Sequence, residues 1–225
     1  MERKFTFSPG EYYHLYNRGT DKRKIFLSDA DHKRFLCLLY VGNSLGPIHI
    51  SDHGSKKIDD LFYIPRASIL VDIGAYCLMP NHFHLLVRAR TQKGVSTFMK
   101  KLLTGYSMYF NKKNERTGKL FEGPFRAQHV TDDRYLEYLF GYIHLNPVKI
   151  IQPQWKERGI KNLSQIKSFL QSYPYSSYPL FNSGENTYAE RILNRSSFPK
   201  YFETTRDFHE FIDLWLTANN VKESP

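Results

Sequence analysis

The stretch from Ser68 to Ala89 limits the fold more than any other part of the chain. It reads SILVDIGAYCLMPNHFHLLVRA, in which two runs rich in aliphatic and aromatic residues flank a short Met79-Pro80-Asn81 turn. Such runs favour extended strands, and the Pro-Asn pair between them favours a turn. The sequence therefore predicts an antiparallel β-hairpin over residues 68–89.

One further strand and several helices are predicted around this hairpin. The aromatic-rich, alternating segment 11–19 predicts the strand. Apolar residues at helical spacing predict three helices, over about 29–41, 95–113 and 133–145. Ser28 and Gly42 mark the two ends of the first helix, and Pro147 ends the third. The Gly-punctuated segment RTGKLFEGPFRAQHV separates the second helix from the third and is assigned no element.

Two regions differ in composition from these elements. Residues 42–68 are rich in Gly, Ser, Asp, His and Pro, which predicts a long surface loop or an insertion. Beyond Lys149, prolines separate short helical candidates around 163–170, 188–193 and 205–216. We therefore expect one main domain over residues 1–150, with the loop insertion at 42–68, and a helical C-terminal extension over residues 151–225.

The charge of the chain indicates a polyanionic partner. Lys and Arg number 32 against 22 Asp and Glu, which gives a net charge of +10 and a pI of about 9.5. Between residues 100 and 126 only Glu115 and Glu122 oppose a run of basic residues: Lys100, Lys101, Lys112, Lys113, Arg116, Lys119 and Arg126. A basic stretch is also what a simple solvated surface looks like, so the charge alone does not separate the two interpretations.

Membrane insertion and secretion are not expected from the sequence. The most apolar stretch, residues 61–79, is interrupted by a proline and two charged residues, and the N-terminus lacks the apolar core of a signal peptide. Cys37 and Cys77 lie in apolar runs without metal or disulfide spacing, which suits a reducing compartment. We expect a cytoplasmic protein with no membrane partner.

The first candidate site lies in the second strand of the hairpin. His82 and His84 are two residues apart, so in a strand both side chains point to the same face and both imidazoles can reach one cation. Phe83, Leu85 and Val87 then point to the opposite, buried face. Hydrogen-bonded strand histidines without a metal fit the same pattern, and both interpretations stay open.

The second candidate site is in the segment YIHLNPVK. Tyr142 and Asn146 are four residues apart and therefore lie one helical turn from each other. The Asn146 amide oxygen can complete an N,N,O ligand set with the two histidines, which leaves Tyr142 beside the cation. The alternatives are that Tyr142 is a core aromatic and that Asn146 caps the helix.

This arrangement suits phosphodiester chemistry. A tyrosine that attacks phosphorus holds the strand covalently and releases a 3′-hydroxyl, so the bond energy is kept and no ATP is needed. A phenol with a pKa near 10 is a poor nucleophile at neutral pH, but a nearby cation favours the phenolate and polarises the phosphate. Tyr106 and Tyr109 are rival nucleophiles, although their spacing on an apolar helix stripe favours packing.

Four segments occur in the order found in a known family: YHLYNRGTDKRKIF, YCLMPNHFHLLV, FNKKNERTGKLFEGPFRA and YIHLNPVK. The chain resembles the single-tyrosine HUH transposases, in the branch associated with repetitive extragenic palindromes (REP). The resemblance covers about residues 8 to 180 and includes YPYSSYP, which is similar to a Trp/Tyr-Ser-Ser-Tyr element of that family. The combination of MPNHFHLLV with YIHLNPVK is its most specific part.

The resemblance implies a fold and a set of functional residues. The fold is α+β, a ferredoxin-like or RRM-like antiparallel sheet with helices packed on it. Tyr142 would be the nucleophile, and His82, His84 and Asn146 the metal ligands, although related enzymes use Gln in the third place. The DNA-binding residues would be basic: Arg18, Lys100, Lys101, Lys112, Lys113, Arg116, Lys119 and Arg126.

The same resemblance implies the partner and the cofactor. The partner would be single-stranded hairpin or palindromic DNA at the bacterial nucleoid, cleaved and rejoined through a 5′-phosphotyrosine link. Mg²⁺ or Mn²⁺ suits the phosphate and amide oxygens, although two histidines also accept Zn²⁺. Where family members often carry Arg, this chain has Pro124, while Arg126 keeps a positive charge.

Three questions stay open at this point. One tyrosine per site requires either a homodimer or sequential use of a single tyrosine. A DNA-binding protein of the same fold without turnover is a second hypothesis. A metal-dependent hydrolase that uses water in place of tyrosine is a third.

Overall fold

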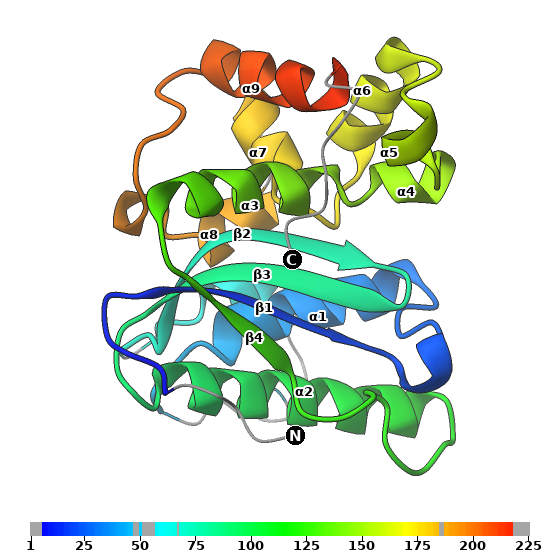
Figure 1. The fold of residues 1–225 in the computed structure, drawn as a ribbon. Coiled ribbons are helices and arrows are strands. Elements are labelled where there is room, and N and C mark those ends of the chain that lie inside the picture. The colour runs from blue at the N-terminus through cyan, green and yellow to red at the C-terminus, as the bar shows by residue number, and fades with distance from the viewer. Residues whose placement is uncertain (1–5, 47–49, 51–56, 67, 185–186, 218–225) are drawn as a thin grey trace.

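The predicted hairpin forms the centre of a four-stranded antiparallel sheet. The computed structural model describes residues 6–46, 50, 57–66, 68–184 and 187–217 (Figure 1). Within these residues the strands are β1 (Tyr12–Arg18), β2 (Val71–Met79), β3 (His82–Ala89) and β4 (Arg126–Val130), in the order β2-β3-β1-β4. The strand at 11–19 and the hairpin are confirmed, whereas β4 falls in the segment for which no element was predicted. The antiparallel α+β class is also confirmed.

Helices cover both faces of the sheet (Figure 1). One face is covered by α1 (Asp29–Val41) and α2 (Gly94–Lys113), and the other by α3 (Asp133–Leu145). The start of α1 is stabilised by Asp31, whose carboxylate accepts a hydrogen bond from the backbone N–H of Ser28, the residue before the helix. All three helices lie where the spacing of apolar residues predicted them.

The C-terminal part of the chain is helical, as predicted. It contains α4 (Val148–Ile151), α5 (Trp155–Arg158), α6 (Leu163–Ser172), α7 (Tyr178–Ser183), α8 (Thr187–Ile192) and α9 (Thr205–Thr217). Short 3-10 helices are η1 (Thr20–Lys22), η3 (Ile58–Tyr63) and η4 (Arg195–Ser197). Pro147 does end α3, but helical structure resumes at once in α4, since proline fits the first turn of a helix.

Two glycines let the C-terminal part approach the sheet and α3 closely. A Cβ on Gly74 of β2 would lie 2.6 Å from the Phe198 ring, and a Cβ on Gly141 of α3 would lie 2.5 Å from the Trp215 indole. Real Cβ atoms do not come so near, so both positions need the missing side chain. Phe140, Phe181 and Phe208 then join one core with the sheet face under α3.

Part of the predicted loop insertion at 42–68 lies outside the described residues, namely 47–49, 51–56 and 67. In its described part Asn43 is buried, donates to Val71 O and accepts from the Leu70 and Val71 N–H groups, while η3 packs against α1. Residues 1–5 of the predicted main domain, and 185–186 and 218–225 of the C-terminal extension, also lie outside. No helix in the described ranges has the length and apolar character needed to cross a membrane.

Candidate active site

The predicted histidines and the predicted tyrosine meet on the sheet face beneath α3. The side chains of β3 alternate as expected: Phe83 and Leu85 enter the core shared with α1 and α2, while His84 points to the opposite face. The ring of Tyr142, on α3, lies edge-on to His84 with 5.4 Å between ring centroids. Side chains almost sixty positions apart in sequence are thus brought together.

The hydrogen bonds of His82 leave one ring nitrogen available to a cation. Asn81 donates through its side-chain nitrogen to Lys22 O at 3.1 Å, so its amide oxygen faces His82. That oxygen accepts from His82 Nδ1 at 2.6 Å. Because an amide oxygen cannot donate, the proton is on Nδ1 and the Nε2 lone pair is available as a metal ligand.

His84 is held in a similar way by His14 of β1, a residue that the sequence analysis did not select. His14 Nε2 and His84 Nδ1 are 2.9 Å apart and both rings are buried. Burial lowers the pKa of His14 to about 4 and that of His84 well below its usual value. One proton is therefore shared between two neutral rings, and if His84 donates it, His84 Nε2 keeps its lone pair.

Asn146 offers an amide oxygen from the end of α3, the helix that carries Tyr142. It is 3% exposed at the C-terminal end of α3, and its side-chain nitrogen donates to Tyr142 O at 2.8 Å. The amide oxygen is then left as an acceptor. In the part of the chain that the structure describes, no three His, Cys, Asp or Glu side chains form a metal-binding group. The histidine pair fits a divalent cation once the Asn146 amide is added, which gives an N,N,O set with positions left for phosphate oxygens.

Positive charge surrounds this site. Burial, together with the nearby charges of Lys149 and Arg18, lowers the pKa of His82 to about 4. Arg18 stands opposite His82 in the β1–β3 register and forms a 2.6 Å salt bridge with Glu122. The Lys156 ammonium lies 5.4 Å from the centroid of the Tyr142 ring.

The basic residues predicted to bind DNA divide into two groups. Arg18 and Arg126 lie on the sheet face that carries the histidines, since Arg126 pairs with Tyr16 in the β1–β4 register. The lysines of α2 belong to the helix on the opposite face (Figure 1): Lys100, Lys101, Lys112 and Lys113. Arg116 and Lys119 lie in the loop that follows α2. The structure does not bring the α2 lysines to Tyr142.

Some of the predicted DNA-binding residues also have partners within the protein. Lys101 donates to Ser44 O and Gly46 O, and Lys113 donates to Asp31. Arg116 donates to Asn111 Oδ1 at 2.6 Å. These contacts give the three side chains a structural role whether or not DNA is bound.

The rival tyrosines Tyr106 and Tyr109 have structural partners on the other side of the sheet. Tyr106 is fully buried and its hydroxyl donates to Ile25 O at 2.5 Å. Tyr109 donates to the Asp31 carboxylate at 3.0 Å. Neither phenol lies on the face that carries His84.

Sequence reasoning missed His14, Lys149 and Lys156 as members of the site. His14 had a usable signal, because Tyr12, His14 and Tyr16 alternate in a strand and so share one face. Lys149 belongs to the YIHLNPVK segment itself. Lys156 had no signal in its neighbouring residues, because its place beside Tyr142 depends on how α5 folds back.

Comparisons with known proteins show what the chain is similar to. The family model described as "Transposase IS200 like" matches residues 49–146, a range that includes the predicted nucleophile and the three predicted metal ligands. No curated protein matches the chain in sequence. Among solved structures, a REP-associated tyrosine transposase bound to a REP hairpin has a TM-score of 0.50 at 12% identity, covering 91% of this chain and 92% of that one.

Two further solved structures are more distant. A putative transposase from Deinococcus radiodurans has a TM-score of 0.34 at 15% identity and covers 64% of this chain and 94% of its own. The tRNA(His) guanylyltransferase of Saccharomyces cerevisiae has a TM-score of 0.35 at 10% identity and covers 89% and 86%. Residues 49–146 are therefore similar to the IS200-like transposase family, and the chain has the fold of the REP-associated tyrosine transposase.

Proposed function

We propose that this protein binds a single-stranded DNA hairpin and cleaves and rejoins it through a covalent bond to Tyr142. The observation that carries the proposal is the position of the Tyr142 ring, 5.4 Å from His84, beside two histidines whose Nδ1 atoms are both hydrogen-bonded. A transposase family, a basic chain and a likeness to a hairpin-bound relative support DNA as the partner.

The reaction follows from the groups present. The Tyr142 hydroxyl oxygen attacks phosphorus and forms a phosphotyrosine bond to the 5′ side of the DNA, while the 3′-oxygen leaves and its bond to phosphorus breaks. The phenol proton passes to water and the 3′-oxygen takes one up, so charge and atoms balance. Attack by a 3′-hydroxyl on the phosphotyrosine reverses the step and joins two DNA ends.

A divalent cation fits this site, with Mg²⁺ or Mn²⁺ as the proposed ion. His82, His84 and Asn146 would hold it. When bound, such an ion polarises the scissile phosphate and favours the phenolate. His14 and Asn81 fix the ring orientations of the two histidines through the hydrogen bonds described above.

The DNA backbone would be held by basic side chains at two distances from the site. Arg18 and Arg126 lie on the sheet face that α3 covers, and α3 carries Tyr142. We therefore assign these two arginines contacts near the scissile phosphate. We assign the α2 lysines, with Arg116 and Lys119, to contacts farther along the DNA, since α2 covers the other face.

The test is incubation with a labelled DNA hairpin and Mg²⁺ or Mn²⁺, followed by denaturing electrophoresis. We expect a DNA-shifted protein band that disappears in Tyr142→Phe. Tyr138→Phe is the matched control, because Tyr138 lies one turn earlier on α3 and its ring stacks on Tyr142 at 6.1 Å. Cleavage that persists in Tyr142→Phe would favour a hydrolase, and binding without cleavage would favour a non-catalytic DNA-binding protein.

A further inference from the structure

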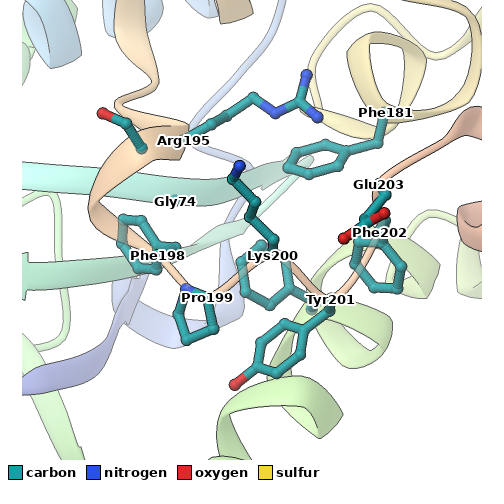
Figure 2. Close-up of a pocket in the computed structure, with 11 residues that line it drawn as sticks. Gly74, Phe181, Arg195, Phe198, Pro199, Lys200, Tyr201, Phe202 and Glu203 are labelled. Atoms are coloured by element: carbon teal, nitrogen blue, oxygen red, sulfur yellow. The ribbon is translucent and has the colours of Figure 1, made fainter.

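A cavity lies on the same side of the sheet as the candidate active site. Residues 195–203, which comprise η4 and most of the segment that leads from it to α9, cover a cavity of about 620 Å³ with β2, α3 and α7 beneath them (Figure 2). We call it the linker pocket. Its volume falls within the roughly 300 to 1,000 Å³ of small-molecule sites.

The walls of the linker pocket are aromatic and held in place. Phe140 and Phe198 are buried, and Phe198 fits against β2 only because Gly74 has no side chain. Tyr201 is half-buried and its hydroxyl donates to the Asp133 carboxylate at the start of α3. Rigid aromatic walls of this kind accept a flat ring at little cost in conformational entropy.

The mouth of the linker pocket carries two cations. Arg195 lies over the Phe181 ring, with 4.8 Å from Cζ to the centroid, and Lys200 is exposed. Figure 2 shows the Arg195 side chain extending toward the Phe181 ring. Among the described residues neither cation forms a salt bridge, and Glu203 is the one carboxylate that lines the pocket. Two cations against one carboxylate favour an anionic group at the mouth.

The linker pocket shares two elements with the candidate active site. Tyr12 of β1 packs against Phe198 at 5.2 Å and its hydroxyl donates to Ser197 O. His14 follows two residues later on the same strand face, about 7 Å away at the usual rise of a strand. Phe140, which lines the pocket, and Tyr142 both belong to α3, although side chains two residues apart on a helix point to different sides of it. A DNA strand that enters the active site can therefore continue along β1 toward the linker pocket.

We propose that the linker pocket binds one unpaired nucleotide of the DNA strand next to the cleavage site. The base stacks against the aromatic walls, and its phosphate lies between Arg195 and Lys200. Stacking on aromatic rings combined with phosphate contacts is how proteins hold single-stranded nucleic acid. This assignment rests on the proposed function for the identity of the polymer, while the pocket itself supplies the preference for an unpaired nucleotide.

The test compares two DNA hairpins with the same stem, one blunt and one with a five-nucleotide single-stranded extension. The protein carries Tyr142→Phe throughout, so that binding is measured without cleavage, by fluorescence anisotropy. The pocket variant is Arg195→Ala with Lys200→Ala. The control is Lys161→Ala with Arg206→Ala, which removes the same charge from exposed positions outside the pocket.

We expect the pocket variant to lose about tenfold in affinity for the extended hairpin and less than about twofold for the blunt one. The control should lose equally little on both. Equal losses on both DNAs, or a control that matches the pocket variant, would show general electrostatics and overturn the assignment. No loss on the extended hairpin would also overturn it. A parent protein that binds neither hairpin would instead refute the proposed function, and the assignment with it.

Discussion

The two faces of the sheet are built from the same strands but hold their residues by different physics. On the α1 and α2 side, Leu15, Phe83 and Leu85 are fully buried among apolar neighbours. On the α3 side, His14 and His84 are almost as deeply buried, at 4% and 5% exposed. Burial of apolar side chains stabilises the first face. On the second face the buried polar groups must form hydrogen bonds, because an unpaired buried polar group costs desolvation free energy. Because side chains alternate along a strand, one face of each strand contributes to stability and the other carries the groups proposed for catalysis.

The most direct test of this difference between the faces is to substitute two neighbouring residues of β3 that point to opposite faces. We expect His84→Ala to reduce covalent complex formation by more than about 100-fold, because even the outer partners of metal ligands contribute 10- to 100-fold. Leu85→Ala should instead lower the free energy of unfolding by about 2 to 5 kcal/mol and leave the cleavage rate of the folded protein intact. Gel assays and urea unfolding check the pair. If both variants lost mainly stability, or both lost mainly covalent complex formation, the proposed difference between the two faces would be refuted.

The sequence predicted the features that depend on local patterns and missed those that depend on contacts between distant residues. His82, His84 and the buried Phe83 and Leu85 were assigned to the correct faces because alternation along one strand is a local property. His14 was missed, since its contact with His84 depends on which strand pairs with β3, and that is set by residues far apart in sequence.

Strand β4 and Lys156 show the same limit of local patterns. The segment RAQHV has neither a β-branched run nor clear alternation, and it becomes a strand only because it pairs with β1 at the sheet edge. Lys156 reaches Tyr142 through the fold of the C-terminal helices. Helices were predicted well because their apolar periodicity is strong over many residues.

One buried charge departs from the apolar rule on the α1 and α2 face. Asp31 is fully buried and accepts hydrogen bonds from the Leu27 and Ser28 N–H groups, the Tyr109 hydroxyl and the Lys113 ammonium. Burial alone would raise the pKa of this carboxyl, but Lys113, Leu27 and Tyr109 together hold it below its usual value. We expect Asp31→Asn to destabilise the protein by about 3 kcal/mol at pH 7.

The pH dependence of that loss provides the check. Because the pKa is lowered on folding, the contribution of Asp31 is complete above the unfolded pKa near 4 and is lost as the pH falls through the folded value. The difference between wild type and Asp31→Asn should therefore shrink below about pH 4. Thermal unfolding of both proteins from pH 7 to pH 3 measures it, and a difference that grows on acidification would contradict the role of this carboxylate.

On the α3 face, His14 is expected to act by orienting His84. We expect His14→Leu to weaken Mn²⁺ binding about 10- to 100-fold, and His14→Gln, whose amide oxygen can accept from His84 Nδ1, to recover part of that loss. His129→Leu is the control, since His129 pairs with Tyr13 and so lies on the other face. Isothermal titration calorimetry reports the affinity without any need for cleavage. Unchanged binding in His14→Leu would remove His14 from the site.

The smallest expected effect concerns DNA binding by cations on the two faces. Arg18 stands opposite His82, whereas Lys100 is exposed on α2, on the far side of the sheet. Both substitutions with Ala should weaken binding, but Arg18→Ala should lower the salt dependence by about one phosphate contact and Lys100→Ala by less. Affinities for one hairpin at several salt concentrations separate the two slopes. If Lys100→Ala lowers the salt dependence more than Arg18→Ala does, the DNA contacts α2 more closely than the position of Tyr142 implies. The basic composition of α2 would then indicate the DNA path better than the face that carries the histidines does.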